Sequence, residues 1–150
     1  MFLFFVSVLT VATAALLQTT EAIAFGPIKP NLVLILIVIL SSIYKDWSYR
    51  FILVLTGATI LKFSELFQLS DLVLIAALLL SIVIIDYLPW RKLINIELAV
   101  ILGTLILNLV VFTPTTLILE TLTNVILTVA IFIIAHIIYE EEIKSQENRF

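Results

Sequence analysis

The sequence contains no cysteine and only one histidine. The absence of cysteine excludes disulfides, thiolate metal sites and cysteine nucleophiles, and it leaves the redox compartment open. With His136 as the single histidine, a multi-histidine metal site is also excluded. The net charge of −3 provides no basic stripe of the kind that nucleic-acid binding requires. We therefore expect no metal, no cofactor and no nucleic-acid partner, and most classes of enzyme are excluded.

Charged residues are also scarce. They make up 13% of the 150 residues, whereas hydrophobic residues make up 63%, and the mean hydropathy is +1.26. A soluble domain carries about 25% charged residues. So few polar side chains cannot cover a globule in water, and the composition predicts an integral membrane protein.

Long apolar runs recur along the chain, and each approaches the roughly 20 residues that a membrane-spanning helix needs. Proline, glycine and charged residues separate the runs. The runs do not alternate as lipid-facing barrel strands do, so the predicted fold is all-α, a compact bundle of six transmembrane helices in a single domain. The predicted spans are 2–17, 28–44, 51–67, 72–88, 94–112 and 117–139, followed by a short cytoplasmic tail over 140–150.

The first apolar run has an alternative interpretation as a signal peptide. Residues 22–24, Ala-Ile-Ala, have the small-x-small form of a cleavage site. However, no Lys or Arg precedes the run, as a signal peptide would require. We expect residues 1–24 to be retained, and the other five spans keep their orientation in either case.

Positive charges favour one side of the predicted membrane. With six spans, that side carries Lys45, Arg50, Arg91, Lys92, Lys144 and Arg149, whereas the other side carries only Lys29. Cytoplasmic loops are enriched in Lys and Arg, so both termini are predicted to be cytoplasmic. All the Tyr and Trp residues lie near the same face, where amphipathic rings favour the headgroup layer.

Several polar residues fall within the predicted spans, where ionisable groups are costly and usually mark a site. Lys62 and Glu65 are three residues apart on one helical face, so they can pair, although Lys62 can also extend its ammonium to the interface. Residues Thr116, Glu120, Asn124 and Thr128 form a stripe at four-residue spacing, and Glu97, Thr104 and Asn108 share a face of the preceding helix.

Such stripes point into a bundle, where hydrogen bonds between helices replace those that lipid cannot provide. An ion pair between Lys62 and Glu120, in the outer half of the membrane, is one hypothesis for these polar residues. The candidate partner-binding residues are Gln18, Lys62, Glu65, Asn108, Glu120 and Asn124. The alternative is that these residues only hold the helices together.

The N-terminal third also resembles a known family. An apolar helix that ends in Leu-Leu-Gln-Thr-Thr, and then Gly-Pro-Ile-Lys-Pro-Asn-Leu before a run of Leu, Ile and Val, is similar to the start of the MreD family of rod shape-determining proteins. The matching residues are Leu17, Gln18, Thr19, Thr20, Gly26, Pro30 and Asn31, with Asn31 in place of the usual acid. The resemblance is good over residues 1–45 and weaker afterwards, because Gly57 alone stands where the family has a glycine-rich third helix.

The resemblance implies a non-enzymatic scaffold of the bacterial cell-elongation machinery in the inner (cytoplasmic) membrane. It implies partners of the MreC and MreB types and the peptidoglycan synthases, bound through contacts between helices, besides the membrane lipid. An alternative function is a small-solute (vitamin-type) substrate-binding component of a membrane transporter, which would need an outward pocket with convergent polar groups. An intramembrane enzyme would need paired Asp, Ser–His or His–Glu residues within a span, and none appears at useful spacing, so we expect no catalytic residues.

Overall fold

The computed structural model describes residues 2–20, 22–24, 26, 28–62, 69–108 and 114–147. These residues form six α-helices and no β-strand, which confirms the all-α prediction for this part of the chain. The helices are α1 (Phe2–Thr19), α2 (Leu32–Ile43), α3 (Trp47–Leu61), α4 (Leu69–Tyr87), α5 (Lys92–Asn108) and α6 (Pro114–Glu147).

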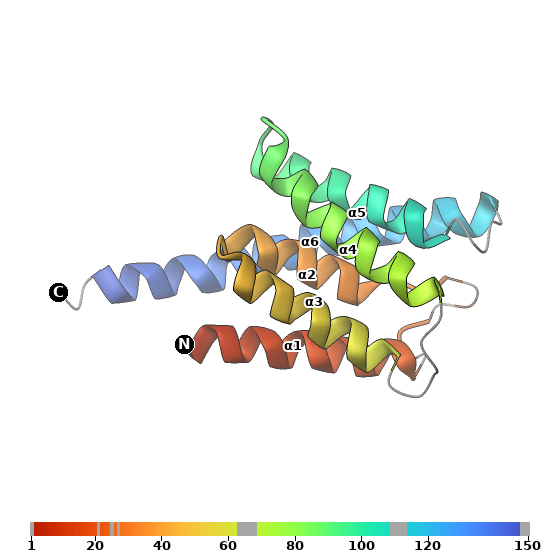
Figure 1. Ribbon diagram of the computed structural model, residues 1–150. Helices are drawn as coiled ribbons and strands as arrows, with labels where there is room; N and C mark the ends of the chain where they lie inside the picture. The colour runs from red at the N-terminus through yellow and green to blue at the C-terminus, as the bar shows by residue number, and fades with distance from the viewer. Residues whose placement is uncertain are drawn as a thin grey trace.

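The helices alternate in direction, so their connections fall at two ends of the bundle (Figure 1). The α2–α3 and α4–α5 turns lie at the end where α1 begins, and the last turns of α6 extend past that same end. We name this the charged end, after Lys45, Arg50, Asp86, Arg91 and Lys92. The opposite end, where α1 is followed by α2, is the amide end, after Gln18, Asn31, Asn108 and Asn124.

The second helix is the centre of the bundle. Helix α2 packs against each of the other five helices, and eight of its twelve residues are buried. Its sequence, LVLILIVILSSI, is apolar on nearly every side, as a helix surrounded by others must be. Neighbouring helices therefore cover this segment, and little of it remains on the outer surface.

Two glycines bring other helices close to α2. A Cβ at Gly57 of α3 would lie 2.7 Å from Val33 Cγ1, and one at Gly103 of α5 would lie 2.8 Å from Leu34 Cδ1. Both distances are shorter than a carbon–carbon contact allows, since the optimum is about 3.5–4.0 Å. Close approach of α3 and α5 to the central helix thus depends on the absence of these side chains.

The helix boundaries differ from the predicted spans by up to three residues in α1, α4 and α5, and by more in the second, third and last helices. The second helix begins at Leu32 instead of residue 28, because Pro30 interrupts the chain and Asn31 caps the helix. The third begins at Trp47 instead of 51, because Asp46 caps it. The last begins at Pro114 and continues to Glu147, through most of the predicted tail. The ends of the predicted spans at 63–67 and 109–112 lie outside the described residues.

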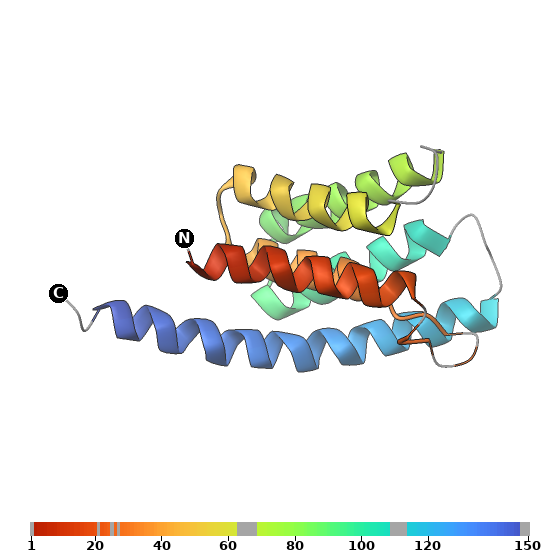
Figure 2. The same cartoon turned by 90° about the horizontal axis from the view of Figure 1, so that it is seen from below.

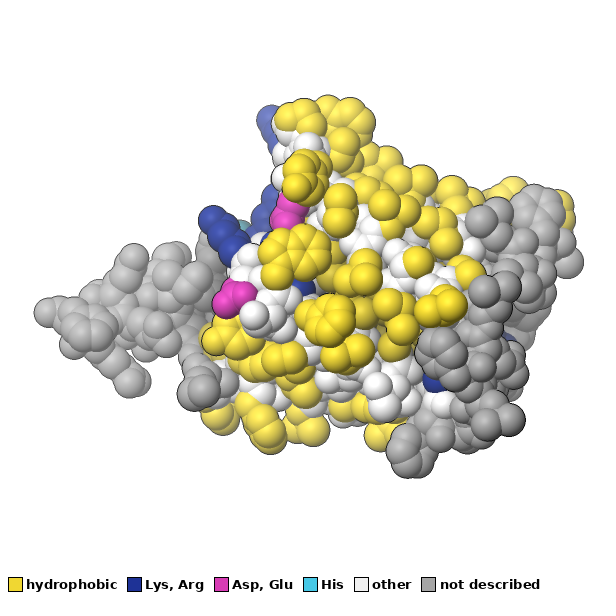
Figure 3. Space-filling view, in the orientation of Figure 1, with side chains coloured by type: hydrophobic (Ala, Val, Ile, Leu, Met, Phe, Trp, Pro, Cys, Tyr) yellow, Lys and Arg dark blue, Asp and Glu magenta, His cyan; other side chains and the backbone are white. Residues whose placement is uncertain are grey.

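The helices differ in length and in how many large apolar side chains they expose. Two segments, Phe2–Thr19 and Pro114–Ile138, are long and apolar enough to cross a membrane by length and composition. Helix α2 has 12 residues and extends about 18 Å, which is less than the roughly 30 Å of a hydrocarbon core. Large apolar side chains are exposed on α1, α3, α4, α5 and α6, and they cover much of the face seen in Figure 3.

Candidate functional site

Polar side chains meet where the central helix begins. Asn31 caps α2, because its Oδ1 accepts a hydrogen bond from the Leu34 N–H at 3.0 Å. Gln18, near the end of α1, accepts from the Val33 N–H through Oε1 at 3.2 Å and donates from Nε2 to Asn31 Oδ1 at 3.4 Å. Two of the N–H groups that a helix leaves without internal partners are thereby bonded to side chains.

The network continues into α6 and α5. The Asn31 N–H donates to Asn124 Oδ1 at 3.0 Å, and Asn124 Nδ2 donates to Thr104 Oγ1 at 2.9 Å. Asn124 and Thr104 are 1% and 2% exposed, so these bonds are shielded from solvent. Asn124 lies ten residues after Pro114, which places the start of α2 about 15 Å along α6. The short central helix thus begins deep in the bundle, and neighbouring helices supply its hydrogen-bond partners.

Two further residues of the predicted site lie beside this network. Glu120 Oε1 accepts from the Lys29 backbone N–H at 3.3 Å, which ties α6 to the segment before α2. Asn108 Nδ2 donates to the Thr104 carbonyl of its own helix at 3.0 Å. Of the predicted partner-binding residues, the structure therefore brings Gln18, Glu120 and Asn124 to one end of the bundle, with Asn108 next to them.

Lys62 lies apart from this cluster. It caps the C-terminus of α3, and its backbone N–H donates to the Ala58 carbonyl at 3.2 Å. In the part of the chain that the structure describes, α3 and α6 do not pack against each other, and α1 and α2 lie between them (Figure 2). The Lys62–Glu120 ion pair therefore stays a hypothesis, between residues on two helices that do not neighbour each other. Glu65 lies outside the described residues.

The residues that carry the family resemblance form the connection between α1 and α2. The Thr19 hydroxyl donates to the Leu16 carbonyl at 2.7 Å, and the Thr20 hydroxyl donates to the Leu17 carbonyl at 3.0 Å. These bonds give hydrogen-bond partners to backbone carbonyls in the last turn of α1. Gly26 has a φ of +64°, in the left-handed region that glycine enters at little cost. The Pro30 carbonyl accepts from the Leu32 N–H at 3.2 Å as the next helix begins.

Glu97, on the predicted polar face of α5, does not join the network. Both of its carboxyl oxygens are buried, and neither has a hydrogen-bond partner among the described residues. Of the three residues predicted to share one face of α5, Thr104 and Asn108 therefore lie at the amide end, and Glu97 does not take part in its hydrogen bonds.

A groove runs along α1 on one side of the bundle. Residues of α2 line it along its length, and α6 lines only the part nearer the charged end. The groove consists of two adjoining clefts of about 190 and 320 Å³, which share Val6, Thr10 and Leu36. The first cleft is closed on its far side by Ile131, Ile134, Ala135 and Ile138 of α6. In Figure 2, α1 and α6 run beside each other on the side facing the viewer, and among the described residues no Cα of α1 lies within 8 Å of a Cα of α6.

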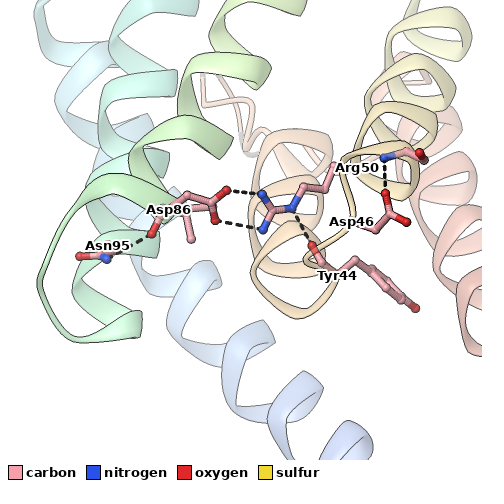
Figure 4. Close-up of polar contacts among 7 residues, drawn as sticks. Tyr44, Asp46, Arg50, Asp86 and Asn95 are labelled. Atoms are coloured by element: carbon pink, nitrogen blue, oxygen red, sulfur yellow. Dashed lines mark hydrogen bonds and ion pairs between the residues drawn. The ribbon is translucent and has the colours of Figure 1, made fainter.

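The charged end contains an ion pair that the sequence analysis missed. The Arg50 guanidinium, from the first turn of α3, donates both terminal nitrogens to the Asp86 carboxylate at the end of α4, with Nη2 3.0 Å from Oδ1 (Figure 4). Arg50 is 3% exposed, and its Nε donates to the Tyr44 carbonyl at 2.6 Å. The guanidinium carbon also lies 5.5 Å from the centre of the Trp47 ring, within the range of a cation–π contact.

The sequence did contain a signal for this pair. Asp86 is an ionisable residue inside the predicted span 72–88, and Arg50 immediately precedes the span 51–67. Two opposite charges at the same end of neighbouring helices are candidates for pairing. Asn95 was missed as well. Its Nδ2 donates to the Ile85 and Leu88 carbonyls at 3.3 and 2.7 Å and so caps the end of α4.

The described residues contain no group of three or more His, Asp or Glu side chains placed to hold a metal ion. No protein-family model matches the chain, and neither a curated protein nor a solved structure shows detectable similarity to it.

Proposed function

We propose that this chain is a multi-pass membrane protein that acts as a non-enzymatic scaffold by binding a transmembrane helix of another protein in the groove along α1. The membrane placement is supported by the exposed surface. Side chains such as Phe2, Leu122 and Ile126 are more than half exposed, and similar residues surround the bundle. A monomer in water rarely exposes contiguous apolar patches larger than a few hundred Å².

The proposed orientation follows the charge distribution. Lys45, Arg91 and Lys92 lie at the charged end together with the exposed rings of Tyr87 and Trp90. Cationic loops on the cytoplasmic side and aromatic rings at the interface are both typical of membrane proteins. The charged end would then face the cytoplasm with both termini, and the amide end would face outward.

The groove is the observation that carries the scaffold proposal. Along α1 it extends from Leu3 to Leu17, about 21 Å, which is most of a membrane-spanning length. Its floor and walls include Ser7, Thr10 and Ala14, small side chains that let a second helix approach closely. An apolar groove of this length suits a helix better than a compact solute.

The polar residues of the amide end have a different part in this proposal. Gln18, Asn31 and Asn124 bond one another and the start of α2, so they fix α1 and α6 against the start of the central helix. The contact surface proposed for the partner therefore lies on the groove, beside these residues. The alternative, a solute-binding component of a transporter, needs convergent polar groups that are open toward the outside, whereas Gln18, Asn31 and Asn124 already bond backbone groups and one another.

The resemblance to the MreD family gives the proposed cellular role. A scaffold of that kind would work in the cell-elongation machinery of the inner membrane, beside MreC-like and MreB-like proteins and peptidoglycan synthases. The partner helix in the groove would belong to a membrane-anchored member of that machinery.

Single cysteines provide a direct test, because the chain has none of its own. Thr10→Cys places a thiol in the groove, and Leu80→Cys places a matched thiol on the exposed surface of α4. Each variant is co-expressed with an MreC-like protein that carries a cysteine in its transmembrane helix, and the disulfide-linked product is quantified after mild oxidation. We expect linkage through Thr10→Cys at least tenfold above that through Leu80→Cys. Equal linkage at the two positions would refute the groove as the binding surface.

A bulky substitution gives the complementary result. Thr10→Trp fills the groove, and we expect it to lower co-purification of the partner about tenfold, while the thermal midpoint in detergent stays near that of the native protein. A Leu80→Trp control should leave co-purification unchanged. Normal partner recovery with Thr10→Trp would contradict the proposal.

A further inference from the structure

A second opening lies at the charged end, away from the groove. It is a pocket of about 500 Å³, within the roughly 300–1,000 Å³ typical of small-ligand sites. Its lining residues are Ser42, Lys45, Arg50, Ile85, Asp86, Trp90, Lys92 and Asn95. Figure 3 shows dark blue and magenta side chains beside a hollow between the α2–α3 and α4–α5 turns.

We propose that this pocket binds the phosphate of an anionic phospholipid headgroup. The proposal rests on the membrane placement described above, and it is independent of any protein partner.

The charges in the pocket favour an anion. Three cationic side chains line it, and Asp86 is the only carboxylate among the lining residues. Asp86 pairs with Arg50, so the ammonium groups of Lys45 and Lys92 are the excess positive charge. Burial lowers the pKa of Lys92, and the nearby charge of Lys45 lowers it further. A phosphate between the two ammonium groups would offset both effects, since an opposite charge favours the ionised form.

The walls of the pocket are held in place before any ligand binds. Asp86 and the Tyr44 carbonyl fix the guanidinium of Arg50, and Asn95 donates to the Ile85 carbonyl of α4 and to the Leu88 carbonyl just after it. Lys92 is also the first residue of α5, and the N-terminus of a helix favours an anion. A rigid site of this kind binds its ligand at a low cost in ordering.

The position of the pocket favours a lipid over a free anion. Trp90 is 57% exposed and Tyr87 is 81% exposed, and both belong to the end of α4 or the turn that follows it. Exposed aromatic rings of this kind occupy the headgroup layer. Ile85 adds an apolar surface to the pocket, and large apolar residues such as Val83 are exposed on the same helix, where an acyl chain could pack.

The test uses the full-length protein in a nonionic detergent. Its thermal midpoint is measured against increasing phosphatidylglycerol, against phosphatidylcholine and against inorganic phosphate. We expect phosphatidylglycerol to raise the midpoint in a saturable way, with little effect of the other two at the same concentrations. An equal effect of phosphatidylcholine would overturn the preference for an anionic lipid. An equal effect of inorganic phosphate would overturn the lipid as the source of the phosphate.

Three charge-removing variants identify the site. Lys45→Gln and Lys92→Gln should each weaken the apparent affinity for phosphatidylglycerol about fivefold, the effect of one cation near an anionic membrane surface. Arg91→Gln removes the same charge from the same end, outside the pocket lining, and should leave the affinity unchanged. Equal weakening by Arg91→Gln and Lys92→Gln would overturn the pocket in favour of a general surface charge.

The midpoint without lipid separates binding from a structural role. Because Lys45 and Lys92 repel each other, Lys92→Gln should keep or raise the midpoint in lipid-free detergent while it weakens the response to lipid. A lower midpoint without lipid together with a normal lipid response would contradict the proposal. Crosslinking in the groove is read out separately, so this test can fail while the scaffold proposal stands.

Discussion

At the amide end, side chains without charge join α1, α2, α5 and α6, whereas at the charged end an ion pair joins α3 to α4. Asn124 and its partner Thr104 are buried, Gln18 and Asn31 are partly exposed, and these side chains bond backbone groups and one another. The ion pair is only partly covered, since the Asp86 side chain is 32% exposed, and it borders an open pocket. Full burial of a charge is costly unless every group is paired, while a neutral amide needs only its hydrogen bonds.

The two ends thus perform different tasks. Side chains at the amide end accept hydrogen bonds from the backbone N–H groups at the start of α2, a short helix that begins inside the bundle. The charged end holds two helices together and leaves excess cations facing outward. Disrupting the charged pair should cost the most, because it would leave a carboxylate without its partner.

Arg50→Met should have the largest effect on stability. It leaves Asp86 unpaired, and we expect a loss of about 3 kcal/mol, at the lower end for a buried pair because the carboxylate is partly exposed. Unfolding in a denaturing detergent measures the change. Adding Asp86→Asn to Arg50→Met should recover part of the loss, and Arg91→Gln should change stability by less than about 0.5 kcal/mol. A loss with Arg50→Met no greater than with Arg91→Gln would contradict the importance of the pair.

Asn124→Leu should cost about 2 kcal/mol. The substitution keeps a similar size but removes the acceptor of the Asn31 N–H and the donor to Thr104, and each unsatisfied buried group costs about 1–3 kcal/mol. The same unfolding assay measures it, with Thr123→Val as the control, because that hydroxyl bonds only within its own helix to the Leu119 carbonyl. If both variants unfold alike, the network does not stabilise the amide end.

Asn31→Ala should cost about 1 kcal/mol, the usual effect of removing a helix N-cap. Asn31→Asp is the matched variant, because its carboxylate can still accept from the Leu34 N–H and from Gln18. We expect Asn31→Asp to retain most of the stability. The two variants are compared by detergent unfolding, and equal losses would show that the cap at this position contributes little.

The smallest effect should be a dependence of stability on alkaline pH at the charged end. The pKa of Lys92 is lowered from 10.5 by burial and by Lys45, so the unfolded chain binds more protons in the range just below 10.5. Stability should therefore rise with pH across that range. Thermal midpoints between pH 8 and 10.5 would show the slope. Lys92→Gln should reduce it, Arg91→Gln should retain it, and a slope that Lys92→Gln leaves unchanged would exclude Lys92 as its source.

The sequence predicted the helices better than it predicted their partners. Uninterrupted apolar runs locate each helix regardless of its neighbours, and the six runs correspond to α1–α6. The spacing of Glu120, Asn124 and Thr128 correctly placed Asn124 and Thr128 toward the inside of the bundle, because four-residue spacing puts side chains on one helical face. The same reasoning could not show that α1 and α2 separate Lys62 from Glu120.

The central position of α2 in the bundle could not be predicted from the sequence either. Its run was predicted as a span of 17 residues, from 28 to 44, but Pro30 and Asn31 shorten the helix to 12. Only the packed structure shows that five helices surround this segment, so that Gln18 reaches the Val33 N–H and Asn124 reaches the N–H of the cap residue Asn31. Arg50 and Asp86 were likewise treated as separate charges until α3 and α4 were placed side by side.

Composition and periodicity alone determined that the chain is helical, apolar and charged mainly at one end, because these properties depend on each segment and its nearest neighbours along the chain. The tertiary structure decided which helix is enclosed, which polar groups satisfy one another and where the groove and pocket open. Those features depend on distances between residues far apart in sequence, as with Asn31 and Asn124. Packing of side chains and the need to pair each buried polar group select those distances, and the linear pattern does not contain them.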